Sequence, residues 1–165
     1  MNRPVLPTLL LLGLAACGGE QPPDAQAAAG LPAGLFAATA PAGAVDVTAL
    51  REGPGDGAQV VVQGRVKEFV DDLAVFTVAD LGLRSCADEE GDNCPTPWDY
   101  CCVAPDVLAA HTLTVEITAD GEIAQGTVKG QGGLDHLVPV VVSGTLSRDD
   151  AGNLAVRADS LHVGG

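Results

Sequence analysis

The feature that most constrains the fold is a set of short segments in which apolar and polar residues alternate. Between positions 112 and 118, Leu113, Val115 and Ile117 alternate with threonine and glutamate without exception. Successive side chains of a strand point to opposite faces, so a period of two predicts a half-buried β-strand rather than a helix. Positions 60–67 show the same period, with Val60, Val62, Gly64 and Val66 on one face.

Further segments extend this pattern along the chain. We expect strands at 60–66, 73–80, 112–118, 122–129, 138–146 and 154–163. Asp71-Asp72 provides a turn, and Asp120-Gly121 is typical of a type I′ hairpin turn, whose two central residues take positive φ. In the last segment the apolar phase slips near Asp159-Ser160, which predicts a β-bulge.

These segments predict an all-β fold: a small closed Greek-key barrel of five to six strands, in which closure removes exposed sheet edges. We expect at most one short helix, at 105–110, with proline in its first turn. The segments 60–66 and 140–146 share the pattern Val-Val-Val-x-Gly-x-apolar, and we interpret their glycines as tight bends at barrel corners.

The first residues predict an export signal. One arginine precedes the apolar stretch 5–14, which is shorter than the about 20 residues that a membrane-spanning helix needs. The run Leu14-Ala15-Ala16-Cys17 resembles the lipobox of bacterial lipoproteins. This resemblance implies cleavage before Cys17, lipidation of its sulfur and acylation of its new amino group, including by palmitate. We therefore expect a signal peptide at 1–16 and a protein of the cell envelope, held on a bacterial membrane outside the cytoplasm by lipid.

Composition divides the rest of the chain. Residues 17–44 consist largely of Ala, Gly, Pro and Gln, so we expect an acylated Cys17 followed by a flexible tether. The barrel domain is expected to occupy residues 45–165.

The order of the strand motifs resembles the OB-fold superfamily. Val-x-Gly-x-Val lies in the first strand, Phe76-x-Val-x-Asp80 in the second, and a Val-x-Val-x-Gly strand returns near the end. The block 94–102, Cys-Pro-Thr-Pro-Trp-Asp-Tyr-Cys-Cys, is similar to a group of uncharacterised planctomycete-type envelope lipoproteins with no assigned activity. This resemblance implies an OB-like domain but no catalytic residues, and fold alone does not specify function.

The charge balance excludes one class of partner. With 22 acidic against 8 basic residues the formal net charge is -14, whereas nucleic-acid affinity depends on Lys and Arg that displace counterions. We expect no nucleic acid partner. No pattern places His111, His136 or His162 beside a nucleophile, so we expect neither an enzyme nor a cofactor.

Four cysteines form the most distinctive motif. Cys86, Cys94, Cys101 and Cys102 are separated by seven, six and no residues. An even number of cysteines in an exported protein favours disulfides, with Cys86 and Cys94 each bonded to one of the adjacent pair, in an order left open. The spacing does not fit the two knuckles of a structural zinc site, so no metal is expected. A metal-handling (zinc or copper) or thiol-redox envelope protein is the alternative.

The same loop, which follows the second strand, supplies the candidate contact surface. It carries the only Trp and the only Tyr of the chain and five carboxylates without a basic residue among them: Trp98, Tyr100, Asp88, Glu89, Glu90, Asp92 and Asp99. Two interpretations stay open for the aromatic pair, a contact surface or a lid over one end of the barrel. The carboxylates indicate a solvated acidic face rather than a calcium site. We expect a binding or scaffold module with a membrane anchor and an envelope protein partner of unspecified identity.

Overall fold

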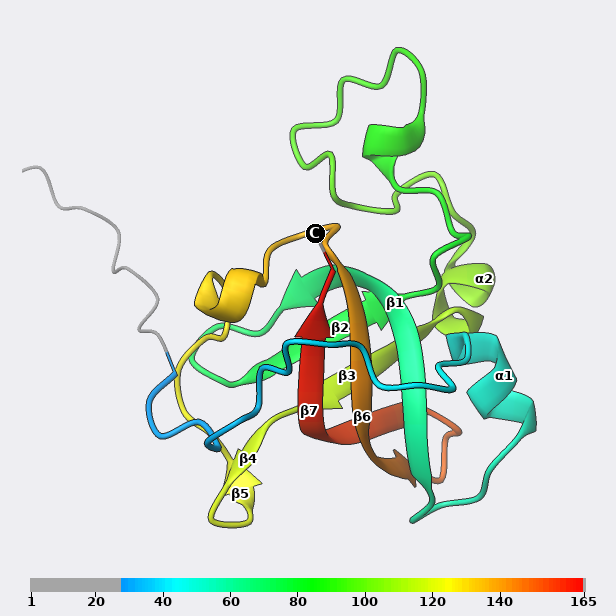
Figure 1. Cartoon of the computed structure of the whole chain (residues 1–165). Helices are drawn as coiled ribbons and strands as arrows, with labels where there is room; N and C mark the ends of the chain where they lie inside the picture. The colour runs from blue at the N-terminus through cyan, green and yellow to red at the C-terminus, as the bar shows by residue number, and fades with distance from the viewer. Residues whose placement is uncertain (1–27, 165) are drawn as a thin grey trace, which may run out of the picture.

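A computed structural model describes residues 28–164 (Figure 1). Its elements, in chain order, are α1 (Val47–Glu52), β1 (Gln59–Phe69), β2 (Val75–Ala79), the 3-10 turn η1 (Cys86–Asp88), α2 (Pro105–Ala110), β3 (Thr112–Glu116), β4 (Thr118–Ala119), β5 (Glu122–Ile123), the 3-10 turn η2 (Gln131–Gly133), β6 (Pro139–Arg148) and β7 (Leu154–Val163). The predicted signal peptide and the lipidation site Cys17 lie outside the described residues.

Five strands pair in a ring, in the order β1-β2-β3-β7-β6, and β6 pairs again with β1. Every neighbouring pair is antiparallel except β3 and β7, which are parallel. Strand β1 is long and curved, and it crosses the front of the ring in Figure 1. The predicted all-β class is confirmed. The predicted helix at 105–110 is also present, with Pro105 in its first turn.

The core lies inside this ring because alternate residues of each strand point inward. The burial pattern of β1 alternates from Val60 to Val66, and β3 buries Leu113 and Val115. Ile117, just beyond β3, is fully buried. Each such apolar side chain stabilises the fold by about 1.5–3 kcal/mol when it leaves water.

Two glycines allow backbones to approach closely. The repeated Val-Val-Val-x-Gly segments lie side by side and antiparallel, with Val62 opposite Val142. A Cβ on Gly64 would lie 2.6 Å from the carbonyl oxygen of Ala79, and one on Gly144 would lie 2.0 Å from that of Arg157. Both glycines are therefore required by contact with a neighbouring strand, and the tight bends predicted for them stay a prediction.

The predicted bulge is also present. The pairing of β6 with β7 shifts register between Ser143, which faces Ser160, and Gly144, which faces Ala158. Asp159 is thus the extra residue on β7, and it bends the strand.

One predicted strand is wrong. Asp120 and Gly121 have the expected positive φ values, 55° and 87°, but the returning chain pairs only over Glu122–Ile123. From Ala124 onward the chain turns back to the barrel, where the N–H of Ala74 donates to the Ala124 carbonyl at 2.8 Å. The prediction failed because contact with the β1–β2 turn competes with continuation of the hairpin. The expectation of at most one short helix is also wrong, because helix α1 is present as well as α2. The six residues of α1 are too few for a helical period to be recognised in the sequence.

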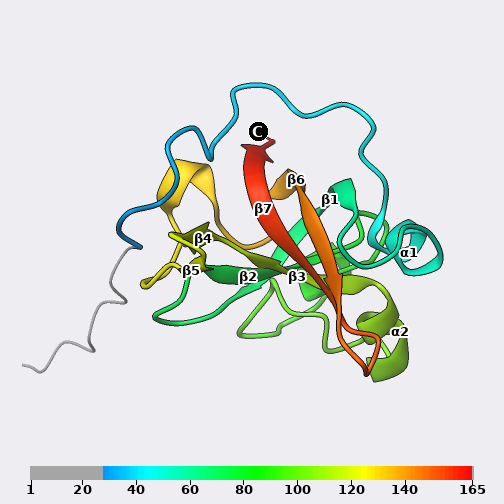
Figure 2. The ribbon, with the colours of Figure 1, turned by 90° about the horizontal axis from the view of Figure 1, so that it is seen from below.

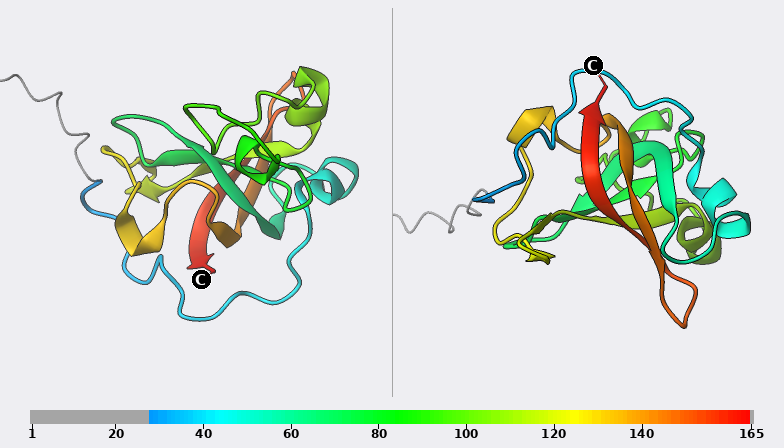
Figure 3. Two further views of the ribbon diagram at one scale, coloured as in Figure 1. Left: turned by 90° about the horizontal axis from the view of Figure 1, so that it is seen from above. Right: turned by 60° about the horizontal axis from the view of Figure 1, so that its bottom comes forward.

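The N-terminal segment, residues 28–46, differs from the predicted flexible tether (Figures 2 and 3). It runs from the η2 side of the barrel, past the end of β7, to α1. Leu35 is 2% exposed, and backbone hydrogen bonds of 2.7 Å join Leu161 to Leu35 and Ala37. The described part of the predicted tether therefore packs on the barrel, because apolar residues at wide intervals are enough to fix an extended chain.

No helix among residues 28–164 is long and apolar enough to cross a membrane.

Candidate functional site

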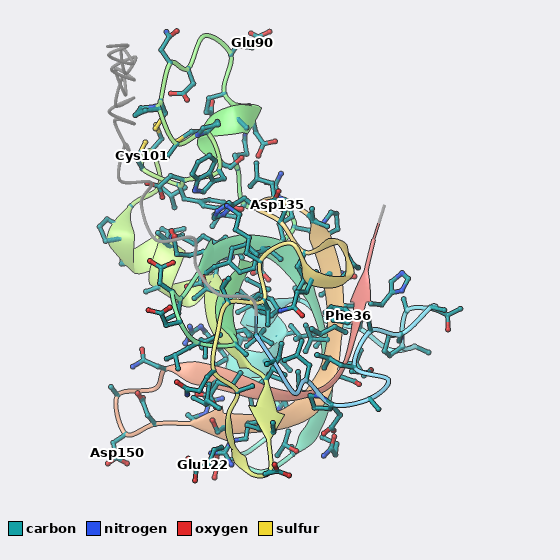
Figure 4. The ribbon with its side chains drawn as sticks, turned by 90° about the vertical axis from the view of Figure 1, so that its left-hand side faces the viewer. Phe36, Glu90, Cys101, Glu122, Asp135 and Asp150 are labelled. Atoms are coloured by element: carbon teal, nitrogen blue, oxygen red, sulfur yellow. The ribbon has the colours of Figure 1, made fainter. Side chains whose placement is uncertain are left out.

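The cysteine loop, residues 81–104, joins β2 to α2 and projects from one end of the molecule (Figure 1). Figure 4 shows Cys101 and Glu90 at this end and Asp150, in the β6–β7 loop, at the other. The insertion therefore stands apart from the regular strands, as predicted.

Backbone hydrogen bonds hold the two halves of the cysteine loop together. The N–H of Cys86 donates to the carbonyl of Asp99 at 2.8 Å, and the N–H of Ala87 donates to that of Pro97 at 2.7 Å. Ser85 and Asp88 form a capping box around η1. These bonds fix the backbone on both sides of the cysteines without any contribution from sulfur.

Arg65 of β1 ties the loop to the barrel. Its guanidinium lies 2.7 Å from the carboxylate of Asp88 and donates to the carbonyl of Leu83 at 2.7 Å. The hydrogen bond from Arg65, together with the Ser85 N–H, holds the pKa of Asp88 well below its usual range. The charge of Asp88 is thus offset by a residue outside the loop, which the sequence alone did not predict.

The aromatic residues serve the attachment of the loop. Tyr100 is 1% exposed, so it cannot belong to a contact surface, and that part of the prediction is wrong. Burial raises the pKa of its hydroxyl. Trp98 is half-buried and stacks on His136 with ring centroids 4.5 Å apart. His136 in turn donates from Nδ1 to the carbonyl of Lys67 at 2.9 Å. The alternative interpretation of the pair, a lid over one end of the barrel, stays a prediction.

Of the remaining carboxylates, Glu89, Glu90 and Asp92 are exposed and Asp99 is half-buried. Glu89 lies 3.1 Å from Arg84. Asp92 accepts from the N–H of Cys94 at 3.0 Å. The acidic face is therefore solvated, and only part of it faces a cation.

The four thiols converge, but none is bonded to another. Cys86 is buried, Cys94 is half-buried, and Cys101 and Cys102 are exposed. The Sγ atoms of Cys86 and Cys101 lie 3.0 Å apart, beyond the about 2.05 Å of a disulfide bond. Contact with Cys101, together with burial, raises the pKa of the Cys86 thiol to about 11. The disulfides stay a prediction.

Two ligand groups of the loop share Cys86. The first group consists of the Sγ atoms of Cys86, Cys101 and Cys102, which lie within 4.8 Å of one another. The second group consists of the Sγ atoms of Cys86 and Cys94 and a carboxylate oxygen of Asp92, which also lie within 4.8 Å of one another. The sequence predicted that the cysteines would be close, but it did not indicate a common centre.

A polar groove that the sequence did not indicate lies on the outer face of β2 and β3. Its volume is about 510 Å³, and the β6–β7 loop and α2 border it. Uncharged polar side chains line much of it: Thr77, Thr112, Thr114, Ser147 and Asn153. The Thr77 hydroxyl is buried and has no hydrogen-bond partner among the described residues. The run of threonines on the polar face of the 112–118 segment was the signal that could have indicated this groove.

His111 also has a partner that the sequence did not indicate. Its Nδ1 lies 2.8 Å from Oδ2 of the buried Asp80, whose Oδ1 accepts from the N–H of Val47 at 2.5 Å. Asp80 thus joins β2, α1 and the start of β3. The third histidine, His162, contacts the N-terminal segment through the carbonyl of Ala37 at 3.0 Å.

The chain matches no protein-family model, and no curated protein matches it significantly. Function therefore has to be argued from the geometry.

Proposed function

We propose that the protein is a lipid-anchored binding module of the bacterial cell envelope, built on an OB-like closed barrel. Strand order supports the fold: β6, β1, β2 and β3 are antiparallel neighbours in that order. A fourth strand that returns beside the first of three consecutive strands is the Greek-key arrangement. OB-folds are five-stranded Greek-key barrels, and the parallel pairing of β3 with β7 completes a ring of five.

The polar groove carries the proposal that this module binds a ligand. It combines the outer face of the second and third strands with the loop between the last two, which is where OB-folds bind oligonucleotides and oligosaccharides. The hydroxyl of Thr77 is desolvated there without a hydrogen-bond partner among residues 28–164, and a ligand that bonds it would recover that cost.

The charges of the groove select among ligands. Asp149 lines it and repels phosphate groups, whereas Glu116, which also lines it, lies 3.6 Å from Arg157. Arg51 also lines the groove, but its guanidinium N–H groups donate to backbone carbonyls such as those of Ala110 and Thr112, at 2.7 and 2.9 Å, and are therefore not free to bind a phosphate group. An uncharged hydroxylated ligand, such as a short oligosaccharide, fits this lining best, and it is bound without chemical change.

The binding test uses NMR. Titration with soluble envelope oligosaccharides should shift the backbone signals of Thr77, Thr114 and Asn153. Thr114→Arg, which fills the groove, should weaken binding by tenfold or more. Thr39→Arg, on the exposed part of the N-terminal segment, is the matched control and should leave affinity unchanged. Equal affinity in wild type and Thr114→Arg would refute the groove as the binding site.

Membrane attachment is tested separately. Cys17→Ser removes the thiol that lipidation requires, and a chain of net charge -14 has no overall electrostatic attraction for anionic lipid. The variant should leave the membrane fraction and appear in the soluble envelope fraction. An unmodified Cys17 in wild-type protein extracted from membranes, detected by mass spectrometry, would refute the anchor.

A further inference from the structure

The four thiols lie around Cys86. Two disulfides pair each sulfur with one partner, whereas the Sγ of Cys86 lies within 4.8 Å of all three other sulfurs. Cys86 is therefore the ligand that two groups share, one with Cys101 and Cys102 and one with Cys94 and Asp92.

The size of the cluster fits one metal ion. Thiolates bind zinc at about 2.3 Å, so two sulfurs on one ion are at most about 4.6 Å apart and about 3.8 Å apart in a tetrahedral site. Within each of the two ligand groups every pair of ligand atoms lies within 4.8 Å, so small side-chain rotations bring them into this range. The 3.0 Å between Cys86 and Cys101 lies between the tetrahedral distance and a disulfide bond, and sulfur reaches either by a small rotation about χ1.

We propose that Cys86, Cys94, Cys101 and Cys102 bind one thiophilic closed-shell metal ion, Zn²⁺ or Cu⁺, around Cys86. Soft thiolate ligands select these ions, and neither group contains an imidazole. Asp92, which belongs to the group of Cys86 and Cys94, offers an oxygen ligand that suits zinc but not Cu⁺.

The protein backbone prepares this site before metal binds. The hydrogen bonds from Cys86 to Asp99 and from Ala87 to Pro97 set the two sides of the cluster, and Arg65 fixes Asp88 two residues after Cys86. Ordering of the ligands therefore costs little when the ion arrives. Cys101 and Cys102 are exposed, so the ion is accessible from solvent and exchangeable. This metal site is independent of the polar groove, which borders the β6–β7 loop.

The test uses the full-length chain with Cys17→Ser, so that only the four loop cysteines remain, reduced under anaerobic conditions. Zn²⁺ alone and Cu⁺ alone are titrated against a competing chelator. We expect one ion per chain, a thiolate-to-metal charge-transfer band with Cu⁺, and protection of the thiols from alkylation. Chelation should release the ion and all four thiols.

Variants separate the ligands from the rest of the loop. Cys102→Ser, at an exposed position, and Cys86→Ser should each lower affinity by tenfold or more. Glu90→Gln, an exposed loop carboxylate outside both ligand groups, is the matched control and should bind as wild type. If Asp92 is a zinc ligand, Asp92→Asn should lower the affinity for Zn²⁺ and leave the affinity for Cu⁺ unchanged. An unchanged affinity for Zn²⁺ in this variant means that all the ligands are sulfur atoms.

Three results would overturn the proposal. One is two disulfides and no metal in the protein taken directly from the envelope without reductant. Another is less than half an equivalent of either ion bound to the reduced chain. The last is unchanged metal affinity in Cys102→Ser, a variant that circular dichroism shows to be folded. None of them bears on ligand binding in the groove.

Discussion

Asp88 shows how one side chain connects the cysteine loop to the barrel. Its carboxylate accepts hydrogen bonds from Ser85, which cap η1, and lies 2.7 Å from the guanidinium of Arg65. Two partners therefore stabilise its charge. Its side chain is 36% exposed, and solvent therefore weakens the ion pair.

Asp88→Asn should lower the free energy of unfolding by about 1 kcal/mol at pH 7. The pKa of Asp88 is lower in the folded protein than in the unfolded chain. Its contribution is therefore complete above the unfolded pKa, near 4, and is lost as pH falls further towards the folded pKa. Urea unfolding at pH 7 and pH 3 measures this, and the difference between variant and wild type should be smaller at pH 3. A difference that grows at pH 3 would contradict the assignment; Glu90→Gln is the control.

Gly144 is constrained by space rather than by φ. A Cβ there would lie 2.0 Å from the carbonyl oxygen of Arg157, which belongs to the strand that pairs with β6. Gly144→Ala should cost about 1–3 kcal/mol or more, because β6 and β7 would have to separate. Gly55→Ala, where a Cβ meets nothing within 4 Å, is the matched control. Thermal melts that show equal stability of the two variants would contradict this account.

At the scale of elements, the N-terminal segment acts as part of the barrel domain. Leu35→Ala should destabilise the protein by about 2–5 kcal/mol, since Leu35 is buried in the core cluster. Thr39→Ala, at an exposed position of the same segment, should have almost no effect. Chemical denaturation of both variants measures this. If Leu35→Ala behaves like Thr39→Ala, the segment is a tether after all and a chain that begins at residue 45 keeps full stability.

The cysteine loop and the η2–β6 connection meet through Trp98 and His136. His136→Ala removes the ring on which Trp98 stacks, so the indole becomes more exposed to water. Fluorescence should shift to longer wavelength, and the signal is unambiguous because Trp98 is the only tryptophan. His162→Ala, on β7, is the control and should leave the emission unchanged. An unchanged spectrum in His136→Ala would mean that the stack does not hold the loop.

The molecule as a whole consists of two parts: a barrel that folds by strand pairing, and an insertion that carries the thiols. The ring of five strands contains none of the four loop cysteines. Reduction and metal removal should therefore leave a β-type circular dichroism spectrum and one cooperative unfolding transition, with Trp98 emission shifted first. Global unfolding on mild reduction or chelation would show that the thiols support the barrel itself.

The sequence determined the strands because burial on one face of a strand imposes a local period of two. It predicted five ring strands, the bulge at Asp159, the glycines of β1 and β6 and the helix at 105–110. It also predicted that the cysteines would lie in one insertion, since they are close in the chain.

Tertiary structure decided what depends on residues far apart in the sequence. Local pattern cannot show that Arg65 reaches Asp88, that Trp98 stacks on His136 or that Leu35 enters the core. The groove arises in the same way, from β2, β3 and the β6–β7 loop. The convergence of the thiols on Cys86 depends on backbone bonds across the loop, such as that from Cys86 to Asp99. The period of a sequence segment indicates which of its faces is buried, whereas only the tertiary structure shows which surfaces are in contact.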